Sequence, residues 1–124
     1  MEFKSVPFHQ ASLYIGCVEG YHGNPYTEDD LRAAIGEFQA SQPKDELVSL
    51  RVTATRFVVG SYDEHGWEVT AINYPRFPKP KAIINNFICN LAKFLITKFN
   101  QNRISIVTPD EIMMLESEEA EQKH

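Results

Sequence analysis

The stretch LVSLRVTATRFVVGSYDEHGWEVTAINY, from Leu47 to Tyr74, decides the fold predicted for this chain. Apolar and polar residues alternate from Val48 to Ala54, which is the pattern of a half-buried strand. Ser61 to Gly66 has the composition of a hairpin loop, and alternation resumes in a returning strand from Trp67 to Tyr74. The alternation changes phase before the loop, so we expect a β-bulge within Thr55 to Phe57. The stretch therefore predicts two antiparallel neighbours in a sheet.

Two helices are predicted on either side of this hairpin. Thr27 can cap a helix that runs to about Ala40, because its hydroxyl accepts hydrogen bonds from free backbone N–H groups and three acidic residues follow it. After the hairpin, apolar residues recur at helical spacing in a helix that begins at Lys81 or Ala82 and runs to about Phe99. Two shorter alternating stretches, Ser12 to Val18 and Arg103 to Val107, predict the first and last strands.

The element order β-α-β-β-α-β predicts an α+β fold of the ferredoxin-like class, with a four-stranded antiparallel sheet and two helices on one face. The segment from Asp110 to Leu115 is expected to form a helical turn or a short extension. The expected core consists of Leu13, Ile15, Cys17, Leu31, Ile35, Phe38, Leu50, Val52, Trp67, Val69, Ile84, Phe87, Ile88, Leu91, Leu95, Ile104 and Ile106.

Length and charge set the domain organisation. A chain of 124 residues suits one domain, which we expect to span residues 1–115. The formal net charge is −5, and all of it lies in the last 15 residues, because the preceding chain carries as many basic as acidic side chains. Residues 116–124 are polar and acidic, so we expect a disordered acidic tail. The neutral body offers little attraction to phosphates, which argues against nucleic acid as a partner.

Export and membrane signals are not seen in the sequence. No run of about 18 apolar residues is present, which argues against a membrane span. The first 20 residues lack the apolar region of a signal peptide. The two cysteines, Cys17 and Cys89, are too few for a disulfide scaffold, so we expect two reduced thiols in a cytoplasmic protein.

Covering one sheet face with both helices would leave the opposite face open. Its threonines, arginines and aromatic residues suit a solvated face, a face for a protein partner or a second copy of the chain, or the floor of a catalytic site. The residues that we expect to bind a partner there are Tyr14, Arg51, Thr53 and Arg103. The same face would carry Thr55, Glu68, Thr70, Ile72 and Ser105.

The connector from Pro75 to Lys81 contains three prolines, so it cannot form a helix or a central strand. Its stiffness lowers the entropy cost of presenting Arg76, Phe77, Lys79 and Lys81 to a protein partner. A proline-stiffened turn whose Phe77 packs on the second helix explains the same residues.

Motifs for catalysis or metal binding are missing from the sequence. No nucleophile, base and orienting group stand at a recognisable spacing. Asp63, Glu64 and His65 fit a polar turn better than a metal site, because they match no metal-binding pattern such as HExxH. Cys17 and Cys89 are expected in the core rather than as nucleophiles. We therefore expect no metal, no cofactor and no catalytic residue.

The hairpin resembles a known group of proteins. Val52 to Thr55 (VTAT), Gly60 to Tyr62 (GSY) and Gly66 to Val69 (GWEV) are similar to hairpins in small uncharacterised α+β proteins, many encoded by bacteriophages. The resemblance covers about residues 47–107. It implies a ferredoxin-like fold and an accessory role in a phage or mobile element, and it assigns no catalytic residue to this chain.

These features predict a small non-enzymatic protein that binds a protein partner through the open sheet face, the connector from Pro75 to Lys81, or both. The alternative is a small enzyme or small-molecule binder, formed when two copies pair through their open faces as a homodimer. Tyr14, Arg51, His65 and Glu68 would then line the cavity between them. A structural subunit of a larger assembly is a third interpretation.

Overall fold

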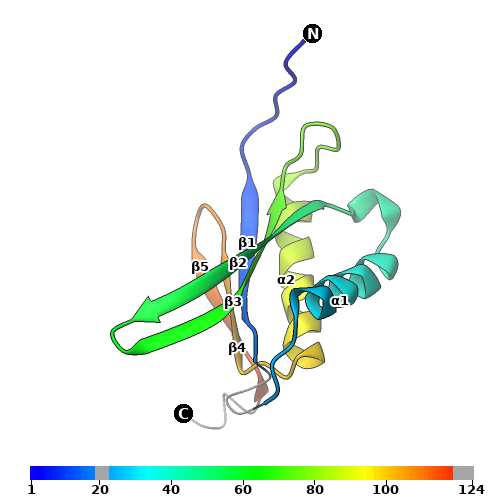
Figure 1. Ribbon diagram of the computed structural model, residues 1–124. Coiled ribbons are helices and arrows are strands. Elements are labelled where there is room, and N and C mark those ends of the chain that lie inside the picture. The colour runs from blue at the N-terminus through cyan, green and yellow to red at the C-terminus, as the bar shows by residue number, and fades with distance from the viewer. Residues whose placement is uncertain (19–22, 119–124) are drawn as a thin grey trace.

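The computed structural model describes residues 1–18 and 23–118. Five strands form one sheet, and two helices pack against one of its faces (Figure 1). The elements are β1 (Gln10–Gly16), α1 (Glu28–Ala40), the short 3-10 helix η1 (Lys44–Glu46), β2 (Ser49–Val59), β3 (Tyr62–Ile72), α2 (Lys81–Lys98), β4 (Arg103–Val107) and β5 (Ile112–Glu116).

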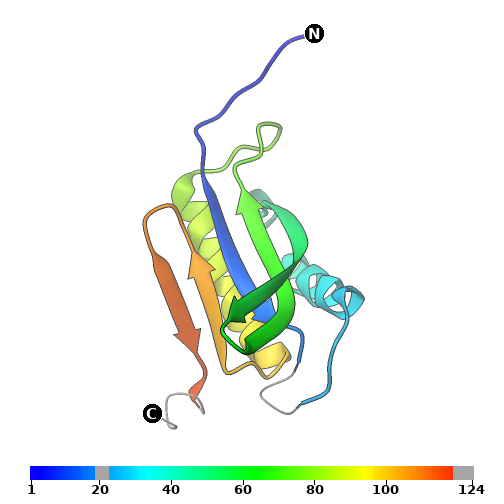
Figure 2. The same ribbon diagram turned by 60° about the vertical axis from the view of Figure 1, so that its left-hand side comes forward.

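The sheet has the order β2-β3-β1-β4-β5, and every pair of neighbouring strands is antiparallel. Figure 2 shows the sheet in front of both helices, which confirms the predicted α+β class and the placing of the helices on one face. The predicted number of four strands is wrong, because β5 adds a fifth strand beside β4.

The fifth strand occupies the segment that was predicted as a helical turn or a short extension. Met113 and Leu115 pack against the core, while Ile112 and Met114 remain exposed on the other face. Four apolar residues in succession conceal this alternation, so the strand pattern is not visible in the sequence.

The first residues of the predicted disordered tail belong to the folded sheet or are bonded to it. Glu116, predicted as the first residue of the disordered tail, is the last residue of β5 and accepts a hydrogen bond from Arg103 Nε at 3.1 Å. The backbone N–H of Ser117 donates to the carbonyl of Asn102 at 2.9 Å. Residues 119–124 of the predicted tail lie outside the described residues, and a single domain over residues 1–115 stays a prediction.

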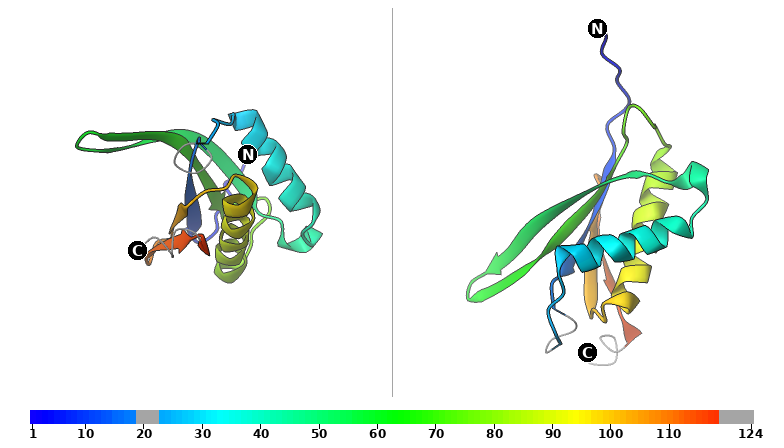
Figure 3. Two further views of the ribbon diagram at one scale, coloured as in Figure 1. Left: turned by 90° about the horizontal axis from the view of Figure 1, so that it is seen from below. Right: turned by 45° about the vertical axis from the view of Figure 1, so that its right-hand side comes forward.

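The β2–β3 hairpin is longer and tighter than predicted. Its register is unbroken from the pair Ser49 and Ile72 to the pair Val59 and Tyr62, so the predicted bulge is absent. The loop is only Gly60 and Ser61, and Gly60 adopts a φ of 59°, which favours glycine. The outer half of the hairpin projects beyond the sheet (Figure 3), where no core requires an apolar face to be maintained.

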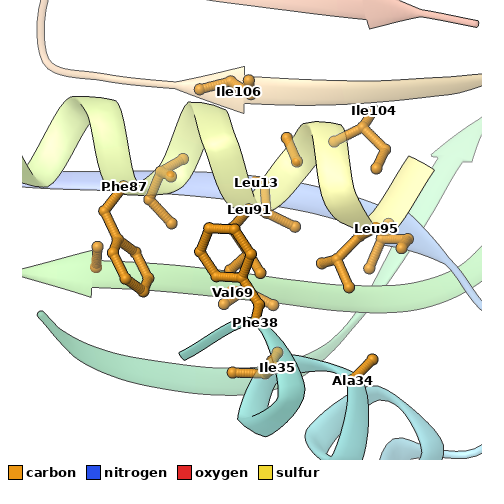
Figure 4. Close-up of a cluster of buried hydrophobic side chains, with 14 of the residues drawn as sticks. Leu13, Ala34, Ile35, Phe38, Val69, Phe87, Leu91, Leu95, Ile104 and Ile106 are labelled. Atoms are coloured by element: carbon orange, nitrogen blue, oxygen red, sulfur yellow. The ribbon is translucent and has the colours of Figure 1, made fainter. Parts of the chain in front are cut away.

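The core lies between the sheet and the two helices (Figure 4). The rings of Phe38 on α1 and Phe87 on α2 meet edge to face with centroids 5.4 Å apart, which joins the helices. Most of the predicted core is buried, but four members are only half-buried: Cys17, Leu50, Val52 and Trp67. Buried side chains that were not predicted are Ala11, Tyr26, Ala34, Val48, Ala71, Ala92, Ile96 and Phe99.

Helix α1 begins as its sequence predicts. The backbone N–H of Asp30 donates to the Thr27 hydroxyl at 3.2 Å, and the backbone N–H of Thr27 donates to the Asp30 carboxylate at 2.9 Å. This reciprocal capping box satisfies two N–H groups that a helix start otherwise leaves free. Within the described residues, neither helix has the length and apolar character needed to cross a membrane.

Candidate functional site

The sheet face away from the helices gathers the residues predicted for it. The register places Tyr14 between Glu68 on β3 and Ser105 on β4. Thr53 on β2 lies on the other side of Glu68. Because side chains alternate across a strand, all four point to the same face, which we call the open face.

A pocket of about 200 Å³ lies on the open face, where the hairpin curls over the end of β1. Residues from four strands meet there. The lining consists of Tyr14, Ile15, Gly16, Thr55, Phe57, Tyr62, Glu64, His65, Gly66, Arg103 and Ser105.

Two aromatic residues join the hairpin to the sheet beside the pocket. The Phe57 ring meets the Tyr14 ring edge to face, with centroids 4.9 Å apart and planes at 70°. Phe57 is nevertheless 43% exposed, so much of its surface is free to contact a ligand. The phase change that suggested a bulge instead places Phe57 on the open face, opposite Glu64 in the register.

The Glu64 carboxylate occupies space that a glycine leaves empty. A Cβ atom on Gly16 would lie 2.2 Å from Glu64 Oε1, so any side chain at this position would displace the carboxylate. The Tyr62 hydroxyl donates a hydrogen bond to the other carboxylate oxygen, Oε2. Gly16 and Tyr62 together hold Glu64 at the pocket.

Gly66 serves a different purpose, which is close approach of two backbones. Gly66 and Gly16 are register partners on β3 and β1. A Cβ atom on Gly66 would lie 2.3 Å from the Ile15 carbonyl oxygen, which belongs to the backbone and has little room to move.

A second carboxylate, Glu68, adjoins the pocket through Tyr14. Burial raises the pKa of the Tyr14 phenol, and the charge of Glu68 and a hydrogen bond to it raise that pKa further. Tyr14 therefore keeps its proton at neutral pH and acts as a hydrogen-bond donor. The Thr70 hydroxyl also donates to Glu68 Oε1, at 3.3 Å.

The end of β1 beneath the pocket is fixed from the helix side. The Tyr26 hydroxyl donates to the Gly16 carbonyl, and the Tyr26 ring stacks on Phe99 with centroids 4.0 Å apart. Gln101 Nε2 donates to the Val18 carbonyl at 2.8 Å. These contacts give the pocket a rigid floor.

The residues predicted for partner binding separate into two groups. Tyr14 and Arg103 line the pocket, while Arg51 and Thr53 lie exposed on β2 along the same face. The second group, Arg76, Phe77, Lys79 and Lys81, lies in the connector between β3 and α2 (Figure 1). No residue of the connector lines the pocket.

In the connector, Arg76 lies over the Phe77 ring at 5.3 Å, and Lys81 Nζ lies 2.7 Å from an Asp110 carboxylate oxygen. Phe77 is 56% exposed, and its ring lies beside that of Tyr74 with centroids 6.2 Å apart, while its packing on the second helix stays a prediction. Partner binding by either group stays a prediction.

Outside the pocket, we looked for reactive cysteines and for side chains placed to bind a metal ion. Both cysteines are half-buried, and burial raises the pKa of the Cys89 thiol, which makes it a poor nucleophile at neutral pH. Among residues 1–18 and 23–118, no group of three His, Cys, Asp or Glu side chains is placed to hold a metal ion.

The pocket residues not predicted for the site are Ile15, Gly16, Phe57, Tyr62, Glu64 and Gly66. Four of them belong to the hairpin, whose loop was predicted too late in the chain and too long. The available signal was Gly60-Ser61, which can form a two-residue turn and would have extended the returning strand back to Tyr62. Tyr62 and Glu64 would then have been assigned to the open face.

Comparisons with known proteins place the fold. No model of a known protein family matches this chain, and no curated protein sequence does. Among solved structures, a phage SAM lyase in complex with S-methyl-5'-thioadenosine has a TM-score of 0.63 at 16% identity. The match covers 95% of this chain and 96% of that one. A phage SAM lyase in the apo state has a TM-score of 0.58 at 18% identity, covering 89% and 90%.

This chain therefore shares its fold with a phage enzyme. The likeness to phage-encoded α+β proteins is confirmed in that coarse form. The prediction of a non-enzymatic binding protein is contradicted, because the structures that share the fold are those of an enzyme. The sequence did not indicate an enzyme, because it contains no recognisable catalytic motif. The structures that share the fold are too different in sequence, at 16% identity for the first, to supply one.

Proposed function

We propose that this chain is an enzyme that binds S-adenosylmethionine (SAM) at the open-face pocket and cleaves it to S-methyl-5'-thioadenosine. The observation that carries this proposal is the pocket itself. It combines aromatic rings, a held carboxylate and a phenol on a fold shared, over nearly its whole length, with a phage SAM lyase. Pockets with a few convergent polar groups on apolar walls are the usual sites for small ligands.

The pocket suits the chemistry of SAM, which carries an adenine ring, a ribose, a sulfonium and an amino acid. The exposed surface of Phe57 offers a face for stacking the adenine or for contacting the sulfonium through the ring quadrupole. The Glu64 carboxylate can accept hydrogen bonds from the ribose hydroxyls or from the ammonium group. The remainder of the ligand would extend over the open face toward Thr53 and Arg51.

Conversion of SAM to S-methyl-5'-thioadenosine breaks the bond between sulfur and Cγ of the amino-acid chain. The electron pair of that bond stays on sulfur, which becomes a neutral thioether. The four-carbon fragment completes its valence without water by closing Cγ onto its own carboxylate oxygen, which forms a lactone and requires no proton acceptor. The positive charge on sulfur and the negative charge of the substrate carboxylate both disappear in this step. Pocket walls that exclude water favour such a loss of charge.

The charge change also limits what Glu64 can do. The positive charge on sulfur disappears during the cleavage, so a carboxylate directly against sulfur would stabilise the substrate more than the transition state. We therefore assign Glu64 to the ribose hydroxyls or the ammonium group, where its contact persists through the reaction. Its role is to orient the substrate in the pocket.

The test is turnover by the purified protein. Incubation with SAM is expected to release S-methyl-5'-thioadenosine, measured by liquid chromatography with mass spectrometry, and the same run identifies the four-carbon product. Heat-denatured protein corrects for the spontaneous decay of SAM. Release no faster than in that control, from protein shown to be folded by circular dichroism, would reject the proposal.

Gly16→Ala tests whether the position of the Glu64 carboxylate matters, because it moves the carboxylate without changing residue 64. The new Cβ would meet the far ends of two side chains, Glu64 at 2.2 Å and Gln101 at 3.4 Å, so we expect the free energy of unfolding to change by less than about 1 kcal/mol. The displaced carboxylate would lower the rate of SAM cleavage about tenfold. Denaturant unfolding and product release measure the two effects.

Gly36→Ala is the matched control, because a Cβ atom on Gly36 of helix α1 meets nothing within 4 Å. Full activity in Gly16→Ala would show that the position of Glu64 does not matter.

The finer assignments of fold and origin are also proposals. The order β2-β3-β1-β4, with two helices on one face, supports a ferredoxin-like core to which β5 is added at one edge. An origin in a phage or mobile element is supported by the phage proteins that share the fold.

A further inference from the structure

Two hydroxyl side chains are buried on the open face, where most neighbouring side chains are in contact with solvent. Thr70 on β3 is 1% exposed and Ser12 on β1 is 5% exposed, and the two are register partners. Their oxygens lie 2.8 Å apart. A buried hydroxyl without a partner is costly, so both depend on the hydrogen bonds that they make here.

The direction of these hydrogen bonds follows from the carboxylate at their end. Ionised Glu68 can only accept, so the single proton of the Thr70 hydroxyl points to Glu68 Oε1. The Thr70 oxygen is then left as the acceptor from Ser12. The chain therefore runs in one sense, from Ser12 to Thr70 to Glu68.

Glu68 is the register partner of Tyr14, which lines the pocket, and the charge of Glu68 contributes to the raised pKa of the Tyr14 phenol. The hydrogen bond from Thr70 restrains the Glu68 side chain, which would otherwise be free to turn toward solvent on this half-exposed face. A restrained Glu68 keeps its carboxylate beside the Tyr14 phenol at the pocket wall.

We propose that Thr70 and Ser12 are positioning residues, which hold Glu68 beside Tyr14 and so keep the Tyr14 side chain in a fixed orientation at the wall of the substrate pocket. The catalytic part of this inference rests on the proposed function. The hydrogen-bonded chain itself does not, and it can be tested without any substrate.

The first measurement is the titration of Tyr14. Nuclear magnetic resonance of protein with carbon-13-labelled tyrosine follows each phenol, and Tyr14→Phe identifies the signal of Tyr14. Thr70→Val keeps the shape and removes the donor to Glu68. We expect Glu68 to turn away, so the pKa of Tyr14 falls toward its ordinary value. Thr70→Ser restores the donor and is expected to restore the titration.

The second measurement is SAM cleavage by the same proteins. Thr70→Val is expected to lower kcat about tenfold with KM changed less than twofold, because orientation rather than binding is lost. Thr70→Ser is expected to recover most of the rate. Thr97→Val, which changes an exposed threonine on helix α2, is the matched control and should alter neither readout.

Each result decides a separate question. An unchanged Tyr14 titration in Thr70→Val overturns the positioning chain, whatever the activity. A shifted titration in a protein that never cleaves SAM rejects the proposed function and the catalytic role, and supports the hydrogen-bonded chain alone. If Thr70→Val does not fold, Ser12→Ala gives the same test with a smaller expected shift.

Discussion

Glu64→Gln is expected to lower kcat/KM for release of S-methyl-5'-thioadenosine about 30-fold. The substitution keeps the size and one oxygen of the side chain, so Tyr62 can still donate to it and the fold is retained. What is lost is the charge-assisted hydrogen bond to the substrate, which contributes about 1.5–3 kcal/mol. Initial rates over a range of SAM concentrations measure the effect.

Glu37→Gln is the control for removing a carboxylate as such. Glu37 lies on helix α1, away from the open face, where it pairs with Lys98 at 3.0 Å and is well exposed. We expect this variant to cleave SAM at the unchanged rate. Equal rates for Glu64→Gln and the parent protein would remove Glu64 from the site.

Gly66→Ala is expected to lower the free energy of unfolding by about 3 kcal/mol, the upper range for a forced clash in a packed structure. Its Cβ would lie 2.3 Å from the Ile15 carbonyl oxygen and 3.1 Å from Gly16 Cα. Both are backbone atoms of the central strand β1, so neither can turn aside as the Glu64 side chain can. Denaturant unfolding followed by circular dichroism gives the change directly.

Gly36→Ala is again the control, and we expect it to raise rather than lower the free energy of unfolding. It has open space around the new methyl group, and alanine is the better helix former by about 1 kcal/mol. Gly66→Ala should therefore unfold at lower denaturant concentration than the parent protein, and Gly36→Ala at the same or a higher one. A Gly66→Ala protein as stable as the parent would mean that β1 and β3 are not in close contact here.

Local patterns were sufficient for much of the fold. Helix α1 begins after Thr27 and α2 begins at Lys81, as capping residues and apolar spacing predicted. β4 was predicted with its observed bounds, Arg103–Val107. The missed strand β5 has no turn residues within it and no clear alternation, and it is stabilised by pairing with β4 and by the packing of Met113 and Leu115 on the core.

The candidate site was harder to predict because it depends on the hairpin register. Tyr14 and Arg103 were assigned correctly to the open face from strand alternation alone. Phe57 and Glu64 become neighbours only when the turn is placed at Gly60-Ser61. An error of a few residues in the turn therefore moved both of them out of the site.

The proposed enzymatic function could not be predicted from these residues for a related reason. The pocket gathers residues from four strands, at spacings that match no sequence motif. The space for the Glu64 carboxylate comes from a glycine on a different strand, Gly16. Such an arrangement is visible only in three dimensions.

The proposed function requires that SAM is bound and cleaved at the open-face pocket. Titration of isotope-labelled protein with S-methyl-5'-thioadenosine, followed by nuclear magnetic resonance, tests it most directly. We expect the largest chemical-shift changes at Tyr14, Phe57, Glu64 and Gly66, saturating with ligand. Changes concentrated in the connector from Pro75 to Lys81, or no changes at saturating ligand, would reject this binding site.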